Sequence, residues 1–377
     1  DYTHFWNGDY LDIAKECLNV CDQPDTSQLT AQGREQALKQ HQDYLLQVLL
    51  ALVIGSETGL PVSKDSIKSI LSLALTEMFR DACIAKRYKD AERMGIGSQA
   101  WRLSPTLQDF LTYCQENSLG DIDAPEAVKY IRLRLQFWLN HGGVGQAISR
   151  PSTVSGTKHL TVFAFTNITD DDEAAILAIA ALNAVVRKAL SHPASIIFID
   201  EASILFKFPS ISRFIGQLCA NGAKAGIRVW ISGQDPNGIA ESDAGQQIIQ
   251  NCNTHLIGGI QNAAISSFVQ HLGYDREVIQ RNASERFLPN RQELYSNWLL
   301  NDSGRLTFCR YYIPSILLGL TANNPDEQTA RALLMQQFPN NRLVGLATFS
   351  RLLAHAMRTD MPIGVAVQEW LDFNGAS

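Results

Sequence analysis

The chain has 377 residues, of which 45% are hydrophobic and 19% are charged, a composition typical of a folded globular protein and not of a disordered or fibrous one. Its net charge of −6 excludes a global basic field that would attract nucleic acid or an anionic membrane surface, so any DNA contact would have to be local. No apolar run reaches the roughly 18 residues that span a bilayer, and the length favours one large α/β domain carrying an insertion.

The first long stretch, residues 34–140, has helical periodicity. Apolar residues between Leu45 and Val53 fall on one face of a helix, and Ser63 is placed to cap the next one. A serine-proline-threonine run precedes a further apolar helix over 107–113, and Pro125 opens another. We therefore expect residues 34–140 to form an all-α lobe.

The pattern then changes to alternating strands and helices. Runs rich in β-branched and aromatic residues at 160–165, 195–199 and 227–231 predict short strands, and helical stretches at 173–190 and 210–220 separate them. Further strands are expected at 254–258 and 305–311. Such alternation predicts crossover units and a mostly parallel sheet, which gives an α/β core over 141–330 and a helical tail over 331–377.

Two carboxylates follow the strand expected at 195–199. Its apolar residues run directly into Asp200 and Glu201, and open α/β folds bind ligands at the carboxyl edge of the sheet. In nucleoside triphosphatases of this layout the first carboxylate holds the magnesium shell and the second activates the attacking water. We assign Asp200 to magnesium, through water, and Glu201 to catalysis. The alternative is that both cap the next helix or lie in solvent.

A glutamine lies just beyond the next expected strand. Gln234 is one strand, helix and strand step from Asp200, and an amide can donate and accept at once. It could therefore orient water and sense a terminal phosphate, as a second catalytic residue. The alternative is ordinary turn chemistry, because glycine, aspartate and proline surround it.

In their order and spacing these residues resemble the conjugative and type IV secretion ATPases of the TraC, TrbE and TrwK class, relatives of the HerA and FtsK motors. The helical block, including 102–110, resembles that family's insertion, and 137–165 resembles its approach to the next strand. Asp200, Glu201 and Gln234 stand where the family has its acidic pair and its motif glutamine. The resemblance implies a RecA-like P-loop NTPase core that uses ATP and magnesium.

The sequence departs from the family pattern at the phosphate-binding loop. No G-x-x-x-x-G-K-[ST] motif occurs, since the stretch 55–60 lacks the lysine and 155–158 lacks the second glycine and the hydroxyl. The family places this loop upstream of the helical lobe. We therefore expect either a segment before Asp1, with residues 1–33 a remnant of the N-terminal part of the motor domain, or a protein that has lost hydrolysis.

A second departure concerns the arginine finger. The family often has an Arg-Lys pair before the strand that leads to the motif glutamine, whereas this chain has Ala223 and Lys224. Alanine cannot serve as an arginine finger, and a lysine offers only a point charge. The resemblance implies that Lys224 is a nucleotide-binding residue.

As a whole, the resemblance implies a motor ATPase that powers type IV secretion, conjugative transfer or pilus assembly by ATP hydrolysis in a ring. The same resemblance implies that this ring is a hexamer. It also implies other secretion subunits as partners and a place in the bacterial cytoplasm, peripheral at the inner membrane. One alternative is a non-hydrolysing scaffold subunit of the same machine. The other is a DNA translocase of the HerA and FtsK kind, which would need a basic ring lumen that this acidic chain does not indicate.

Overall fold

The computed structural model of the chain describes residues 2–27, 29–55, 59–95, 98–115, 124–154, 158–165 and 171–375. The described residues divide into two compact units, one of Asp9–Asn251 and one of Asp1–Gly8 with Cys252–Ser377. This boundary falls inside the core expected over 141–330. Residues 56–58 and 155–157, within the two stretches that lack the phosphate-binding pattern, lie outside the described residues.

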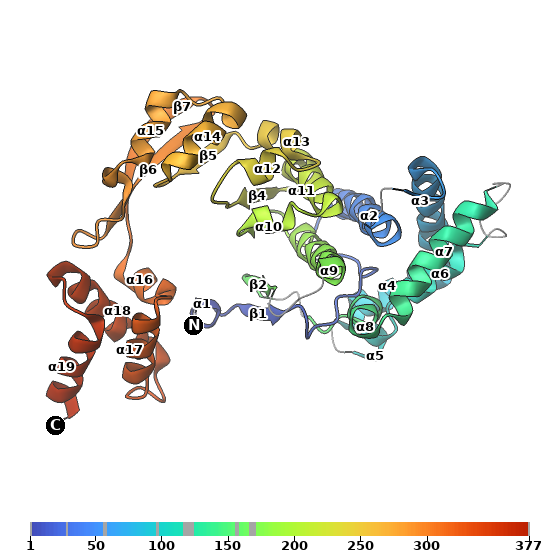
Figure 1. Cartoon of the computed structure of the whole chain (residues 1–377). Helices are drawn as coiled ribbons and strands as arrows, with labels where there is room; N and C mark the ends of the chain where they lie inside the picture. Colours follow the sequence, from blue (N-terminus) through green and yellow to red (C-terminus); the bar gives the residue numbers. More distant parts are fainter. Residues whose placement is uncertain are drawn as a thin grey trace. The chain divides into compact units, whose positions relative to one another are not determined.

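The unit Asp9–Asn251 contains the helical block and a set of short strands (Figure 1). Its strands are β1 (Asp9–Asp12), β2 (Thr161–Ala164), β3 (Ser195–Ile199) and β4 (Ile227–Ile231). Its helices are α2 (Ala31–Ile54), α3 (Lys64–Arg80), α4 (Ala82–Met94), α5 (Gln99–Arg102), α6 (Leu107–Tyr113), α7 (Pro125–Asn140), α8 (Gly142–Ser149), α9 (Asp171–Leu190), α10 (Ala202–Leu205), α11 (Pro209–Asn221), α12 (Asn237–Ala240) and α13 (Gly245–Asn251), with a 3-10 turn η2 (Gly222–Ala225).

Local sequence signals explain where the helices of the block begin. Ser63 caps α3 by accepting a hydrogen bond from the Ser66 amide, and Pro125 is the first residue of α7. Thr106 and Asp109 form a reciprocal capping box at the start of α6. These three starts confirm the helices expected from the sequence.

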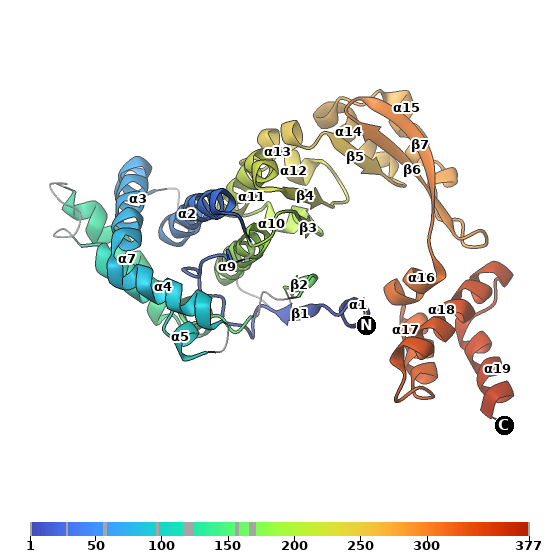
Figure 2. The same ribbon diagram turned by 180° about the vertical axis from the view of Figure 1, so that it is seen from behind.

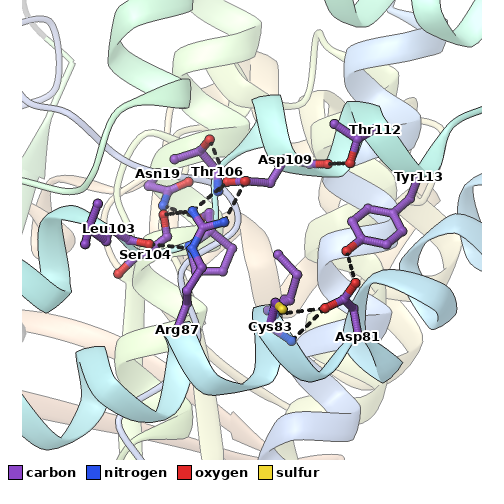
Figure 3. A network of polar contacts seen from close by, with 12 residues as sticks. Asn19, Asp81, Cys83, Arg87, Leu103, Ser104, Thr106, Asp109, Thr112 and Tyr113 are labelled. Carbon is purple, nitrogen blue, oxygen red and sulfur yellow. Dashed lines mark hydrogen bonds and ion pairs between the residues drawn. The ribbon is translucent and has the colours of Figure 1, made fainter.

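An ion pair between Arg87 and Asp109 joins α4 to α6 within the helical block (Figure 3). Arg87 of α4 donates to both carboxylate oxygens of Asp109, at 2.6 and 2.9 Å, and to the carbonyl oxygens of Leu103 and Ser104. Asp109 also accepts from the Thr106 amide at 2.8 Å, so the same carboxylate caps α6 and holds α4. Burial alone would raise the pKa of Asp109, but the hydrogen bonds from Arg87 and Thr106 together with the positive charge of Arg87 lower it overall.

The strands of this unit form two separate parallel pairs, β1 with β2 and β3 with β4. β3 and β4 lie side by side in register, with Ser195 opposite Ile227 and Ile199 opposite Ile231 (Figure 2). The buried residues Ile197 and Ile199 lie on the face of β3 that packs on helices, whereas alternate residues point to the opposite face. That opposite face is exposed and carries the large apolar side chains Ile196, Phe198 and Trp230, together with the charged Arg228, which lies opposite Ile196.

The second unit contains an antiparallel sheet, β5 (Thr254–Ile257), β6 (Tyr295–Asp302) and β7 (Arg305–Tyr312), in that order. The expected mostly parallel sheet is therefore wrong for this part of the chain. Ser303 and Gly304, both with positive φ, form a two-residue hairpin turn, which makes β6 and β7 antiparallel. The strand β6 was not anticipated from the sequence.

Short helices cover one face of this sheet. They are α14 (Ile265–Leu272), α15 (Arg276–Gln280) and the 3-10 turns η3 (Asn262–Ala264), η4 (Arg281–Ala283) and η5 (Glu285–Phe287). The core between them and the strands gives β5 and β6 apolar packing of their own, which explains why the unit boundary precedes β5. Its buried members are Ile257, Ala264, Ile265, Phe268, Tyr274, Ile279 and Leu299.

The chain continues into helices α16 (Ser315–Thr321), α17 (Pro325–Met335), α18 (Arg342–Thr359) and α19 (Ile363–Gly375), and a short helix, α1 (Tyr2–Phe5), belongs to the same unit. A separate apolar cluster that includes Leu334, Phe349 and Val367 holds α17, α18 and α19 together. The described residues of the stretch 331–377 lie mainly in the end of α17 and in α18 and α19. Across the part of the chain that the structure describes, no helix combines the length and apolarity needed to cross a membrane.

Candidate functional site

The candidate site lies at the carboxyl edge of the β3–β4 pair, where both strands end together. Asp200 follows Ile199 of β3, and Ser232 follows Ile231 of β4. The Ser232 hydroxyl donates a hydrogen bond to Oδ1 of Asp200. The register of the two strands thus brings the first expected site residue against a side chain from the neighbouring strand, and both lie at the edge where open α/β folds bind ligands.

Glu201 adopts an unusual backbone conformation beside this contact. Its φ and ψ angles are 47° and 43°, the left-handed region that non-glycine residues seldom occupy. Its amide donates to the Ser232 hydroxyl at 3.2 Å and to Asp200 Oδ1 at 3.1 Å. The structure therefore brings Asp200, Glu201 and Ser232 together. Both carboxylate residues are exposed and free to meet a ligand.

Gln234 lies in the loop that joins β4 to α12, and it is exposed. The neighbouring Asp235 accepts a hydrogen bond from the Asn237 amide at 2.8 Å, which is the turn chemistry that the alternative interpretation expects of this loop. The residue that reaches Asp200 from β4 is Ser232. The catalytic role of Gln234 stays a prediction.

Lys224 lies at the other end of the strands. It belongs to η2, three residues before β4 begins, whereas Asp200 follows the last residue of β3. Five residues of strand span roughly 16 Å, so one chain does not bring Lys224 and Asp200 together. Lys224 is exposed, and its carbonyl oxygen accepts from Gln36 at 2.7 Å. A nucleotide-binding role for Lys224 would need a neighbouring subunit.

The residues present suit a magnesium ion. Mg²⁺ prefers oxygen ligands, keeps several of its waters and is commonly bound through one or two carboxylates together with substrate phosphates. Asp200, Glu201 and Ser232 offer only oxygen atoms, and Asp200 uses Oδ1 for its hydrogen bonds within the chain. No group of three or more His, Cys, Asp or Glu side chains in the described residues could enclose a metal ion. An exposed carboxylate that acts through water fits these donors better than a closed metal site.

Ser232 was not anticipated from the sequence. A serine followed by glycine after a strand is common in turns, so its sequence context does not single it out. The signal that could have found it is the register of β3 and β4. Once Ile199 and Ile231 are aligned, the next residues on the two strands, Asp200 and Ser232, must be neighbours.

Comparison with known proteins decides the fold. No family model and no curated protein matches the sequence. Among solved structures, VirB4 of Thermoanaerobacter pseudethanolicus matches with a TM-score of 0.55 and 12% identity, over 83% of this chain and 78% of that chain. The chain shares the fold of VirB4. The resemblance to type IV secretion ATPases is thereby confirmed at the level of a mixed helix and strand fold shared with VirB4, whereas the RecA-like core stays a prediction, and the identity is too low to transfer an activity.

A more distant match is the plasmid coupling protein TrwB, solved in complex with ADP and Mg²⁺. Its TM-score is 0.42, its identity is 15%, and the alignment covers 83% of this chain and 80% of that chain. The unbound form of the conjugative coupling protein TrwB matches with a TM-score of 0.40 and 14% identity, over 72% of this chain and 68% of that chain.

Proposed function

We propose that this chain is a motor ATPase domain of the type IV secretion and conjugation kind, and that the carboxyl edge of β3 and β4 is the magnesium and water side of its ATP site. The observation that carries the proposal is the acidic pair Asp200-Glu201, which follows β3 at the ligand-binding edge and contacts Ser232, the residue after β4. The VirB4 fold supports the same assignment.

Each residue has a separate role in this proposal. Asp200 binds the hydrated magnesium ion through its exposed carboxylate, with Oδ1 held by Ser232. Glu201 accepts a proton from the attacking water, which is the work of a general base. Magnesium, when bound, neutralises charge on the phosphate oxygens. Gln234 orients the water, and Lys224 contributes a positive charge to a nucleotide held by a neighbouring subunit.

The proposal includes assembly into a ring, a hexamer by analogy with related motors. A site at a sheet edge leaves room for groups from the next subunit, and Lys224 lies too far from Asp200 to serve the same nucleotide within one chain. Other secretion subunits at the cytoplasmic side of the bacterial inner membrane are the proposed partners. DNA is a less favoured partner because the net charge is −6.

The test is Glu201→Gln in the protein as its gene encodes it. The amide keeps the shape of the side chain and cannot act as a base, so we expect ATP binding to persist while hydrolysis falls at least about a hundredfold. Binding is measured with a labelled ATP analogue and turnover by phosphate release. Glu241→Gln is the control, since Glu241 is an exposed carboxylate just after α12. Turnover of Glu201→Gln at the parent rate would reject Glu201 as the base.

The missing phosphate-loop pattern gives a second measurement. These 377 residues contain no G-x-x-x-x-G-K-[ST], whose backbone amides and lysine would hold the phosphates. We therefore expect the 377-residue chain by itself to bind Mg·ATP weakly or not at all. Tight, magnesium-dependent binding would mean that other residues hold the phosphates. If the protein that the gene encodes neither binds nor hydrolyses ATP, the non-hydrolysing scaffold function is the better one.

A further inference from the structure

Ser232 forms hydrogen bonds with the residues around the Asp200-Glu201 turn through both its backbone and its side chain. Its amide donates to the Ile199 carbonyl at 2.9 Å, and its carbonyl accepts from the Ala202 amide at 3.0 Å. These two backbone bonds continue the pairing of β3 and β4 beyond the last strand residues. They place the Ser232 side chain beside the acidic pair whatever that side chain is.

The hydroxyl then acts on both acidic residues at once. It donates to Asp200 Oδ1 and accepts from the Glu201 amide at 3.2 Å. A serine hydroxyl has one proton to donate and lone pairs to accept with, so one small group can serve both neighbours. An alanine at this position would keep the backbone bonds and lose both side-chain bonds.

The Glu201 backbone needs such support. The left-handed region is unfavourable for a residue that carries a Cβ atom, and such a conformation persists only where its surroundings hold it. The amide of Glu201 has two acceptors, Asp200 Oδ1 at 3.1 Å and the Ser232 hydroxyl, and Asp200 Oδ1 is itself held by Ser232. Both acceptors of the strained residue therefore depend on one hydroxyl group.

We propose that Ser232 is a positioning residue, whose hydroxyl fixes the Asp200 carboxylate and holds Glu201 in its left-handed conformation so that the two carboxylates are presented together. The role of the carboxylates rests on the function proposed above. The support given by Ser232 does not, because it follows from the hydrogen bonds alone.

The first test measures amide hydrogen exchange by NMR in the 377-residue chain, for the parent, Ser232→Ala and Ser232→Thr. We expect the Glu201 amide to exchange about tenfold faster in Ser232→Ala, the scale of losing one net hydrogen bond. The Ala202 amide is the internal control, because its acceptor is the Ser232 backbone carbonyl, and its rate should stay unchanged. Threonine keeps the hydroxyl, so Ser232→Thr should restore the parent rate at Glu201.

Two results would overturn the proposal. One is an unchanged exchange rate at Glu201 in Ser232→Ala, which would mean that Asp200 alone holds the amide. The other is equal acceleration at Glu201 and Ala202, which would mean general loosening of the loop. Neither result depends on ATP, so this test stands even if the protein proves to hydrolyse nothing.

The second test applies to the protein as its gene encodes it, where turnover can be followed against magnesium concentration. A freed Asp200 should bind the hydrated ion less well, so Ser232→Ala should need about tenfold more magnesium for half-maximal turnover, which threonine restores. A Ser232→Ala variant with the parent magnesium requirement would count against positioning. Absence of turnover in the parent would reject the proposed function and leave the exchange result valid.

Discussion

Arg187 of α9 forms an ion pair with Asp22 inside the protein, with 2.7 Å between Nη1 and Oδ2 and side-chain exposures of 11% and 1%. Asp22 also accepts from Asn19 at 2.6 Å, and the Asn183 amide group donates to the Val20 carbonyl at 2.8 Å. The segment around Val20 and Asp22, which follows β1, is therefore bound to α9 by buried polar contacts. Buried charges of this kind are costly when one partner is lost.

We expect Arg187→Met to destabilise the unit Asp9–Asn251 by about 3–5 kcal/mol, because it leaves the Asp22 carboxylate buried without its partner. Urea unfolding followed by circular dichroism measures the change. The matched control is Arg213→Met, which breaks a pair with Asp243 in which both side chains are 44% exposed, and which should cost no more than about 1 kcal/mol. Equal effects of the two substitutions would show that burial of the Arg187 pair does not matter.

The second prediction concerns His41 of α2, which is 1% exposed and whose ring nitrogens have no hydrogen-bond partner among the residues that the structure describes. Burial, with a smaller contribution from Arg187, lowers the pKa of His41 to about 3 from an ordinary value of 6.5. Between pH 6.5 and about 3, His41 therefore binds a proton in the unfolded chain but not in the folded chain. The stability that neutral His41 provides is present above pH 6.5 and is lost as the pH falls toward 3.

We expect His41→Leu to remove this contribution. Between about pH 7.5 and 5.5 the parent should lose about 1.4 kcal/mol more stability than the leucine variant, the value for one proton bound across one pH unit below the unfolded pKa. Urea unfolding at the two pH values gives the difference. His271→Leu, at an incompletely buried position near the end of α14, is the control. An equal pH dependence of the parent and His41→Leu would contradict a buried neutral His41.

Much of this fold is predictable from sequence because it depends on local patterns. The strands β3 and β4 match the expected ranges 195–199 and 227–231, since short runs rich in β-branched and aromatic residues between polar turns indicate strands. The strand β6 was missed because it mixes apolar residues with Asn297, Asn301 and other polar residues. Its antiparallel pairing depends on the Ser303-Gly304 turn and on packing against distant helices, which periodicity does not reveal.

The candidate site was predictable only in part, for the same reason. Asp200 and Glu201 follow a recognisable strand, so their place at the sheet edge could be predicted. The contact with Ser232 depends on the register between two strands separated by α10 and α11. The left-handed conformation of Glu201 depends on that contact. Neither feature has a local sequence signal.

The third prediction concerns the open face of β3 and β4. Phe198 and Trp230 are register partners on that face, and they are 59% and 58% exposed. Parallel sheets are normally covered on both faces, and contiguous exposed apolar surface marks a binding site or promotes association.

We expect the dye 8-anilinonaphthalene-1-sulfonate to bind the 377-residue chain, and Phe198→Thr with Trp230→Thr to remove most of its fluorescence enhancement. Threonine keeps the preference for strands, so stability should change little. Leu133→Thr, which removes an exposed apolar side chain of α7, is the control and should leave the signal unchanged. Dye fluorescence that survives the double substitution would place the apolar surface elsewhere.

The last prediction concerns Gln234, which is exposed in the loop after β4 and which we propose orients the attacking water. In the protein as its gene encodes it, we expect Gln234→Ala to keep ATP binding and to lower turnover about a hundredfold, the scale of losing one transition-state hydrogen-bond donor. Gln246→Ala, at an exposed glutamine of α13, is the matched control and should turn over at the parent rate. Parent-level turnover of Gln234→Ala would leave this residue with turn chemistry alone. A separation of more than roughly 12 Å, over two strand spacings, between its amide and the Asp200 carboxylate in the nucleotide-bound protein would lead to the same conclusion.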